Sequence, residues 1–129
     1  MQLYFDFLHQ VGINFNSGTS DEKRKSSIIH KTLGLMKFKS IYTTNFDHHI
    51  EEALKDVGKK VNRISTIADF LNSNYNYDCE VIKFHGTLEE PSTIILTETR
   101  YFDRMNLEEA VDQRLRADLL SNSFVFIGY

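Results

Sequence analysis

The chain has 129 residues, of which 41% are hydrophobic and 26% are charged, and its net charge is −3. This length and balance predict one globular domain, residues 1–129, because the chain is shorter than those that usually divide into several domains. The small negative charge provides no global field that would attract nucleic acid or an anionic membrane. We therefore expect neither direct nucleic-acid binding nor membrane binding.

Cys79 is the only cysteine, which excludes an internal disulfide framework and a cysteine-rich zinc cage within this chain. A reducing cytoplasm is the expected location. The first eight residues are apolar, but they lack a basic leader and include Asp6, which argues against a signal peptide. No apolar run approaches the length of a membrane span.

The N-terminal part is predicted to contain two helices separated by a polar loop. Residues 1–11 suggest a buried helix, and residues 14–25 are polar and charged, as in a loop. Ser26 or Ser27 is well placed to cap a second helix that ends at Leu35. The inner face of that helix is predicted to consist of Ile28, Ile29, Thr32 and Leu33.

The next segment predicts a strand, a helix and a second strand. Residues 38–42 are predicted to form the first strand, and a helix is predicted to follow Asn45 and to end at Val57. Gly58 is suited to the position after the helix end. Residues 61–64 predict a short strand. The helix is predicted to be buried through Phe46, Ile50, Ala53, Leu54 and Val57.

The remaining segments continue the alternation of helices and strands. Strands are predicted at residues 80–84, 94–96 and 123–127, and helices at 66–71, 97–105 and 107–120. The last helix has one apolar face, made of Leu107, Ala110, Val111, Leu115 and Leu119. This alternation predicts an α/β fold, a Rossmann-like three-layer arrangement of a parallel sheet with helices on both faces.

Three of the apolar runs are followed at once by polar residues or glycine. Asn45 and Asp47 follow the first run, His85 and Gly86 follow the strand at 80–84, and Gly128 follows the last run. Ligands of open α/β sheets lie outside the carboxyl ends of the strands. We therefore expect these residues to line one pocket.

Their side chains suit cleavage of an N-glycosidic bond to a charged base. If the base departs as a neutral group, the enzyme must stabilise a ribosyl cation and direct the acceptor. His85 has the chemistry to accept a proton from water or a ribose hydroxyl. Asn45 is suited to orienting that water, and Asp47 to fixing an amide of the departing base or the loop.

Other interpretations of these residues are open at the level of sequence. Asn45 and Asp47 are also favoured helix caps, and a histidine at a strand end is often a structural residue. His48 and Glu52 lie four positions apart on one predicted helix face, and with His49 they form an alternative metal-dependent hydrolase site. No third ligand is fixed by spacing, so a site without metal is the main prediction.

The ordered set of motifs resembles one family. Thr43-Thr44-Asn45-Phe46-Asp47, then His85-Gly86 after a strand, then an apolar run into Gly128-Tyr129 are similar to the bacterial sirtuin-like (silent information regulator two) proteins of the NAD-hydrolysing type. The resemblance covers residues 28–129 and includes the spacer 93–98. Any one of these motifs alone is a weak signal.

This resemblance implies a role for each matched residue. His85 matches the catalytic histidine, Asn45 the residue that positions ribose or water, and Asp47 the neighbouring acid of the same motif. Thr44 stands where protein-deacetylating sirtuins commonly have glutamine, which argues against deacetylation. The residues implied to contact NAD are Thr43, Thr44, Asn45, Asp47, Gly86 and Gly128.

The function implied is hydrolysis of NAD to nicotinamide and ADP-ribose, with NAD as substrate and no metal, in an effector of anti-phage defence. Self-association or a defence-system partner protein is expected. A non-catalytic module that senses NAD or ADP-ribose, or serves in assembly, is the alternative. The family usually opens with a strand and a glycine-rich loop and continues after the last motif. Neither feature is found here, so we expect the central part of a domain, incomplete at both ends.

Overall fold

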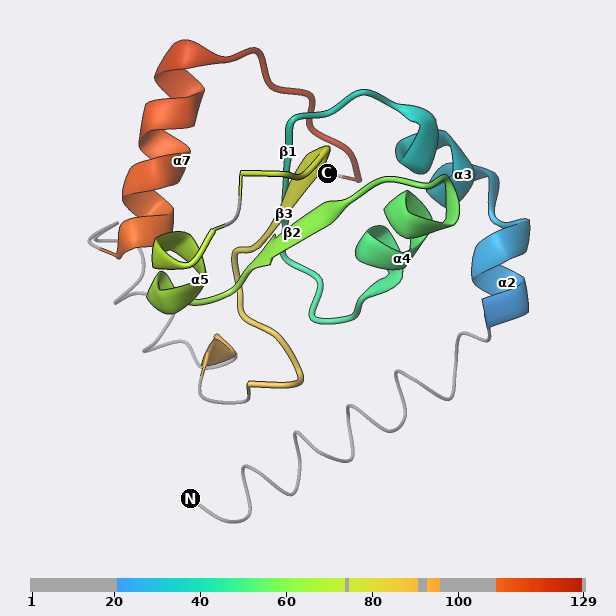
Figure 1. The fold of residues 1–129 in the computed structure, drawn as a ribbon, viewed down its shortest axis with the longest axis horizontal. Helices are drawn as coiled ribbons and strands as arrows, with labels where there is room; N and C mark the ends of the chain where they lie inside the picture. Colours follow the sequence, from blue (N-terminus) through green and yellow to red (C-terminus); the bar gives the residue numbers. More distant parts are fainter. Residues whose placement is uncertain (1–20, 74, 91–92, 96–108, 129) are drawn as a thin grey trace. The chain divides into compact units, whose positions relative to one another are not determined.

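The computed structural model describes residues 21–73, 75–90, 93–95 and 109–128 (Figure 1). The chain divides into two compact units, residues 1–94 and residues 95–129, and each is described by itself. Among the described residues, the first unit contains a three-stranded sheet and the second contains the helix near the C-terminus. None of the described helices has the length and apolar character that crossing a membrane requires.

The sheet consists of β1 (Ser40–Thr43), β2 (Val61–Ile64) and β3 (Cys79–Lys83), in the order β1-β3-β2. β3 pairs in parallel with both neighbours. All five of its residues are buried, as expected of a central strand covered on both faces. The three strands predicted at 38–42, 61–64 and 80–84 are confirmed, with ends that differ by at most two residues.

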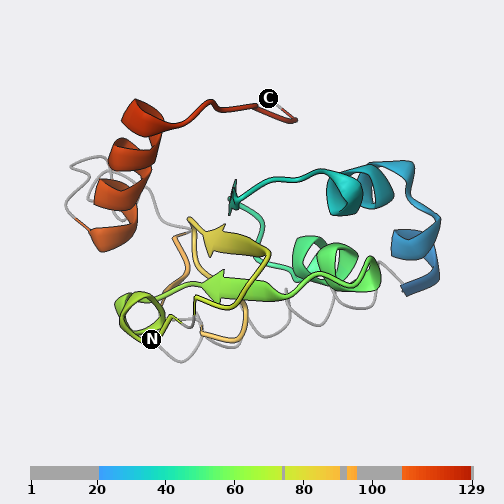
Figure 2. The ribbon, with the colours of Figure 1, turned by 45° about the horizontal axis from the view of Figure 1, so that its top comes forward.

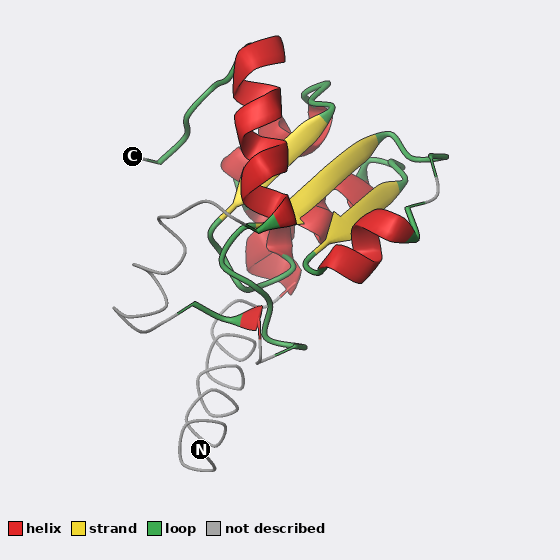
Figure 3. Cartoon of the chain, turned by 90° about the vertical axis from the view of Figure 1, so that its left-hand side faces the viewer, coloured by secondary structure: helices red, strands yellow, loops and turns green. Residues whose placement is uncertain are grey.

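The two crossovers between these strands run in opposite directions. α4 (His49–Asp56) connects β1 to β2 across the sheet, and α5 (Ile67–Leu71) leads from β2 back to β3. Because such crossovers are right-handed, the two helices lie on opposite faces of the sheet. Figures 1 and 3 show helices on both sides of the strands. The Rossmann-like α/β arrangement predicted from the sequence is therefore confirmed for an open, incomplete sheet.

Local signals fix the ends of both crossover helices. Thr66 caps α5 through a capping box, in which its hydroxyl accepts from the Asp69 N–H and the Asp69 carboxylate accepts from the Thr66 N–H. Gly58 follows the end of α4 with φ +83°, the left-handed conformation that glycine adopts at low cost. Both boundaries lie where the sequence predicts them.

The core forms where α4 meets the sheet. Leu54, Cys79 and Val81 are buried together, and Ile41, Ile50 and Val61 pack against them. Burial raises the pKa of the Cys79 thiol to about 11, so the thiol stays protonated at neutral pH. The apolar face predicted for this helix is largely correct, because Ala53 and Leu54 are buried, although Val57 is exposed.

The N-terminal helices differ from the prediction. α2 (Asp21–Ser26) occupies part of the segment that the sequence suggested was a polar loop. The reason is tertiary, because the buried Arg24 forms ion pairs with Glu52, at 3.0 Å, and with Asp56 on α4. A charged segment is helical here because another helix supplies its counter-charges.

α3 (Ile28–Leu35) begins after Ser27, whose hydroxyl accepts from the His30 N–H, so the predicted cap is confirmed. The predicted inner face is wrong, since Ile28 and Ile29 are 79% and 72% exposed. α3 meets α4 through Gly34, where a Cβ would lie 2.7 Å from the Ala53 carbonyl oxygen. Figure 2 shows the two helices side by side. Close backbone approach, and not isoleucine burial, sets this contact.

The second unit contains α7 (Ala110–Ser121), which overlaps the helix predicted at 107–120 and ends one residue later, and Val111 is a buried apolar residue of this helix. The strand predicted at 123–127 is wrong, because these residues are irregular and pair with no described strand. Ile94 and Ile95 likewise lie in no strand. The predictions for residues 1–11, 97–105, 107–108 and position 96 lie outside the described residues.

Candidate functional site

The carboxyl ends of β1 and β3 lie side by side. Thr43 and Lys83 are paired in the parallel register, and the Phe84 N–H donates to the Thr43 carbonyl at 2.9 Å. Asn45 and His85 each follow two residues after this pair. The fold therefore brings the predicted orienting amide and the predicted base to one edge of the sheet, as expected for a ligand site in an open α/β protein.

The loop after β1 is shaped by its own side chains. The buried Thr43 hydroxyl accepts from the Asn45 N–H at 3.1 Å, and the Asp47 carboxylate accepts from the His49 N–H at 3.1 Å. Asp47 thus lies one residue before the N-cap His48 and accepts from the first N–H of α4, so it is not the cap residue itself. Asn45 is exposed and Thr44 is half-buried. Of the predicted residues in this loop, Asn45 has the most accessible side chain.

The turn after β3 positions His85. The histidine is half-buried, and its ring lies against Phe84 with centroids 5.7 Å apart. Gly86 follows with φ +91°, and a Cβ at this position would lie 2.3 Å from the Thr93 carbonyl oxygen. Only glycine fits this backbone. Gly86 therefore sets the course of the chain next to the histidine, whatever contact it makes with a ligand.

Lys83 and Glu51 form a buried ion pair that the sequence analysis missed. Both side chains are almost completely buried, and the Lys83 Nζ lies 2.9 Å from the Glu51 Oε1. The same Nζ donates to the carbonyl oxygens of Asn45, at 3.4 Å, and Asp47. The signal was a single charge within the apolar run 81–84, where a buried lysine requires nearby counter-charge and acceptors.

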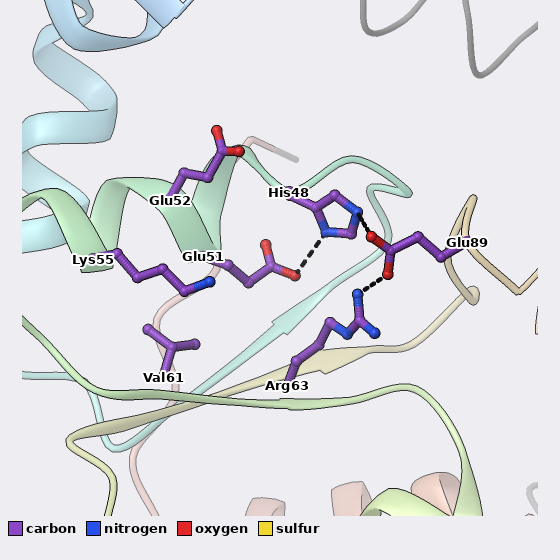
Figure 4. A pocket seen from close by; sticks show the side chains of 7 residues that line it. All are labelled: His48, Glu51, Glu52, Lys55, Val61, Arg63 and Glu89. Atoms are coloured by element: carbon purple, nitrogen blue, oxygen red, sulfur yellow. Dashed lines mark hydrogen bonds and ion pairs between the residues drawn. The ribbon is translucent and has the colours of Figure 1, made fainter.

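A polar pocket of about 300 Å³ opens between α4 and β2. Figure 4 shows His48, Glu89 and Arg63 joined across its mouth: the His48 Nε2 lies 2.9 Å from the Glu89 Oε1, and Arg63 pairs with the same carboxylate. Burial alone would raise the pKa of Glu89, but the hydrogen bond from Arg63 and the charge of His48 lower it. The lining residues are His48, Glu51, Glu52, Lys55, Val61, Arg63 and Glu89, a set that includes neither Asn45 nor His85.

The residues of the alternative metal site face different partners. His48 is engaged with Glu89, whereas His49 lies 4.0 Å from the Glu52 carboxylate and edge-on to the His30 ring. Within the described ranges, no group of three histidine, cysteine, aspartate or glutamate side chains is arranged to hold a metal ion. The geometry gives the metal-dependent hydrolase no support.

Comparison with known families matches residues 39–129 to the SIR2-like domain. The chain belongs to this family. The match spans the strands, the loop with Asn45 and the turn with His85. The family resemblance inferred from the motifs is thus confirmed. Gly128 lies in the second unit with φ +84°, and its predicted place in the pocket stays a prediction.

The chain is similar to curated proteins that bear the name NAD(+) hydrolase ThsA. It is 33% identical over 100 residues to the protein of Cytobacillus dafuensis and 30% identical over 100 residues to that of Bacillus cereus strain MSX-D12. Each match covers 78% of this chain. The protein of Enterococcus faecium is 28% identical over 109 residues, 84% of this chain. The chain spans only 20%, 21% and 23% of the lengths of these three relatives.

Proposed function

We propose that the chain is part of an NAD hydrolase that cleaves the nicotinamide–ribose bond to give nicotinamide and ADP-ribose. The observation that carries the proposal is the position of Asn45 and His85. Each follows its strand by the same two residues, Asn45 after Thr43 and His85 after Lys83, and Thr43 and Lys83 are paired in the sheet. The names of the relatives, which are NAD(+) hydrolases, support the same reaction.

In this proposal His85 accepts a proton from the attacking water, and Asn45 orients that water at the ribose carbon. The nicotinamide ring leaves as a neutral group, so the ribosyl cation is the species that requires stabilisation. A positioned base of this kind typically contributes about 10²- to 10⁴-fold. The exposed position of Asn45 and the half-buried position of His85 are compatible with access to a substrate.

The other predicted contact residues divide into two groups. The side chains of Thr43 and Asp47 accept hydrogen bonds from backbone N–H groups. We therefore assign these two residues to shaping the loop that faces NAD. Thr44 and Gly86 are proposed to border the nucleotide, and a contact of Gly128 with it stays a prediction of the sequence. No metal takes part in the proposed reaction.

We further propose that the protein acts in the reducing cytoplasm as an effector of anti-phage defence. The Thr-Thr-Asn-aromatic-Asp pattern at residues 43–47 and the kinship with the NAD(+) hydrolases support this role. Self-association or a partner protein would then control the depletion of NAD. Survival of phage-challenged cells that express the wild-type protein or the His85→Ala variant tests the defence role.

The enzymatic test is release of nicotinamide from NAD by the purified protein, followed by chromatography. We expect release by the full-length protein that contains this chain, and a loss of about 10²- to 10⁴-fold in its His85→Ala variant. His30→Ala is a matched control, because it removes a histidine from α3, outside the site. Calorimetry with NAD completes the design, since binding without release would contradict hydrolysis and identify a sensing module.

Asn45 gives a second, independent test. Asn45→Ala should lower kcat while the KM for NAD changes little, because an orienting amide acts on the geometry of the reacting atoms. Asn45→Asp should be nearly as damaging, since a carboxylate cannot donate a hydrogen bond. A raised KM at unchanged kcat would show that Asn45 only binds the ground state.

A further inference from the structure

Lys83 is a charged side chain at the end of the central strand, where its neighbours are apolar. Its side chain is 0% exposed, and the four other residues of β3 are buried with it. Burying an ammonium group is costly unless opposite charge and hydrogen-bond acceptors surround it. Nothing in the pairing of a parallel strand requires a lysine at this position.

The acceptors of Lys83 belong to the loop that carries Asn45. The ammonium group donates to the carbonyl oxygens of Asn45, at 3.4 Å, and Asp47. The Lys83 side chain thus fixes the backbone of the loop at two places, at Asn45, which is proposed to orient water, and at Asp47. Since His85 follows Lys83 by two residues, the same contacts set the loop relative to the turn that carries the proposed base.

Glu51 supplies the counter-charge from the first turn of α4. Its Oε1 lies 2.9 Å from the Lys83 Nζ, yet neither of its oxygens has an aligned hydrogen-bond donor among the described residues. The contact is therefore one of charge, while the directional bonds of the ammonium group go to the loop. Figure 4 shows Glu51 at the wall of the polar pocket, below His48.

We propose that Lys83 is a positioning residue for the proposed NAD hydrolysis. Its ammonium group holds the Asn45 loop in the reactive geometry, and Glu51 neutralises the charge of that ammonium group. This inference rests on the proposed function. Asn45 is exposed, so its orientation depends mainly on the backbone beneath it. A misplacement of about 1 Å in such a group can cost about 10²-fold in rate.

The test separates positioning from simple stabilisation of the fold. Lys83→Met alone leaves the Glu51 carboxylate buried without a counter-charge and should lower the melting temperature. The double variant Lys83→Met/Glu51→Met removes both charges, and replacing a buried ion pair by apolar side chains commonly preserves stability. We expect the double variant to melt near the wild-type temperature, with kcat still lower by about 10²-fold and the KM for NAD little changed.

Lys55→Met is the matched control, because it removes an exposed lysine from the same helix as Glu51. It should leave the melting temperature, kcat and KM unchanged. Wild-type kcat in a folded double variant would overturn the proposal. A parallel loss of kcat and melting temperature in the single variant, with both recovered in the double, would make Lys83 a purely structural residue.

Hydrogen exchange provides a readout that does not depend on activity. The Asn45 and His49 N–H groups are bonded within the loop, so release of the loop in the double variant should accelerate their exchange. If the wild-type protein released no nicotinamide, the proposed function would fail, but the exchange rates would still test Lys83. Unchanged exchange at both amides would contradict the positioning role.

Discussion

Two segments that the sequence predicts to be strands, each with a glycine shortly after it, differ in their structures. Residues 79–83 form the central strand β3, buried and paired on both sides, whereas residues 123–127 are irregular. Val125, Phe126 and Ile127 are 65%, 73% and 54% exposed. An apolar run becomes a strand only where neighbouring strands accept and donate its hydrogen bonds. The comparison shows how much of a strand is decided outside its own sequence.

Substitution of one isoleucine in each run should give the largest difference. Ile82 is fully buried, so Ile82→Ala should destabilise the protein by about 3 to 4 kcal/mol through lost burial and a cavity. Ile127→Ala should cost less than about 0.5 kcal/mol, as surface substitutions usually do. Urea unfolding of both variants measures the two values, and similar costs would show that 123–127 is buried in solution.

The glycines that follow the two segments, Gly86 and Gly128, allow a second comparison of their stability. Gly86→Ala would place a Cβ on a left-handed backbone and against the Thr93 carbonyl. Strain and overpacking together should lower the free energy of unfolding by about 3 kcal/mol. The substitution should also suppress nicotinamide release by displacing His85. Gly128 has a similar φ, but nothing lies within 4 Å of a Cβ there, so Gly128→Ala should cost only about 1 kcal/mol. Unfolding free energies of the two variants test this ranking.

Thiol reactivity compares the two runs without altering β3. Because burial raises the pKa of Cys79 to about 11 from 9.0, its thiolate is about a hundredfold scarcer than in an unperturbed thiol. Iodoacetamide at pH 8 should modify native Cys79 slowly and a cysteine introduced by Val125→Cys rapidly. Mass spectrometry of labelled peptides resolves the two positions. Rapid native labelling of Cys79 would indicate that β3 opens locally.

The smallest expected effect concerns α5, which contains no buried residue and depends on its cap. Burial alone would raise the pKa of Asp69, but hydrogen bonds from the Ser65 and Thr66 N–H groups hold it below the ordinary 3.8. Its stabilising contribution is therefore present above pH 4 and is lost as the pH falls through the lowered value.

Asp69→Ala should cost about 1 kcal/mol at pH 7 and remove this part of the pH dependence. Unfolding of wild-type and variant proteins at pH 7, 4 and 3 measures both effects. A constant difference across this range would show that the carboxylate charge is not involved.

Much of the candidate site could be predicted because its signals are local. An apolar run that ends in polar residues predicted the positions of Asn45 and His85, and parallel pairing of their strands then placed them at one edge. The role of Lys83 could not be predicted in the same way. Its acceptors are 38 and 36 positions away in the sequence, and only the fold brings them within reach.

The sequence by itself determined the α/β class, the three strands, the cap at Ser27 and the family, because each depends on residues close together in the chain. Only the tertiary structure decided that a charged segment forms α2, that Gly34 rather than Ile28 meets α4, and that residues 123–127 form no described strand. Ion pairs, close backbone contacts and strand pairing join residues that are distant in the chain. Local patterns carry no information about which of those partners will be present.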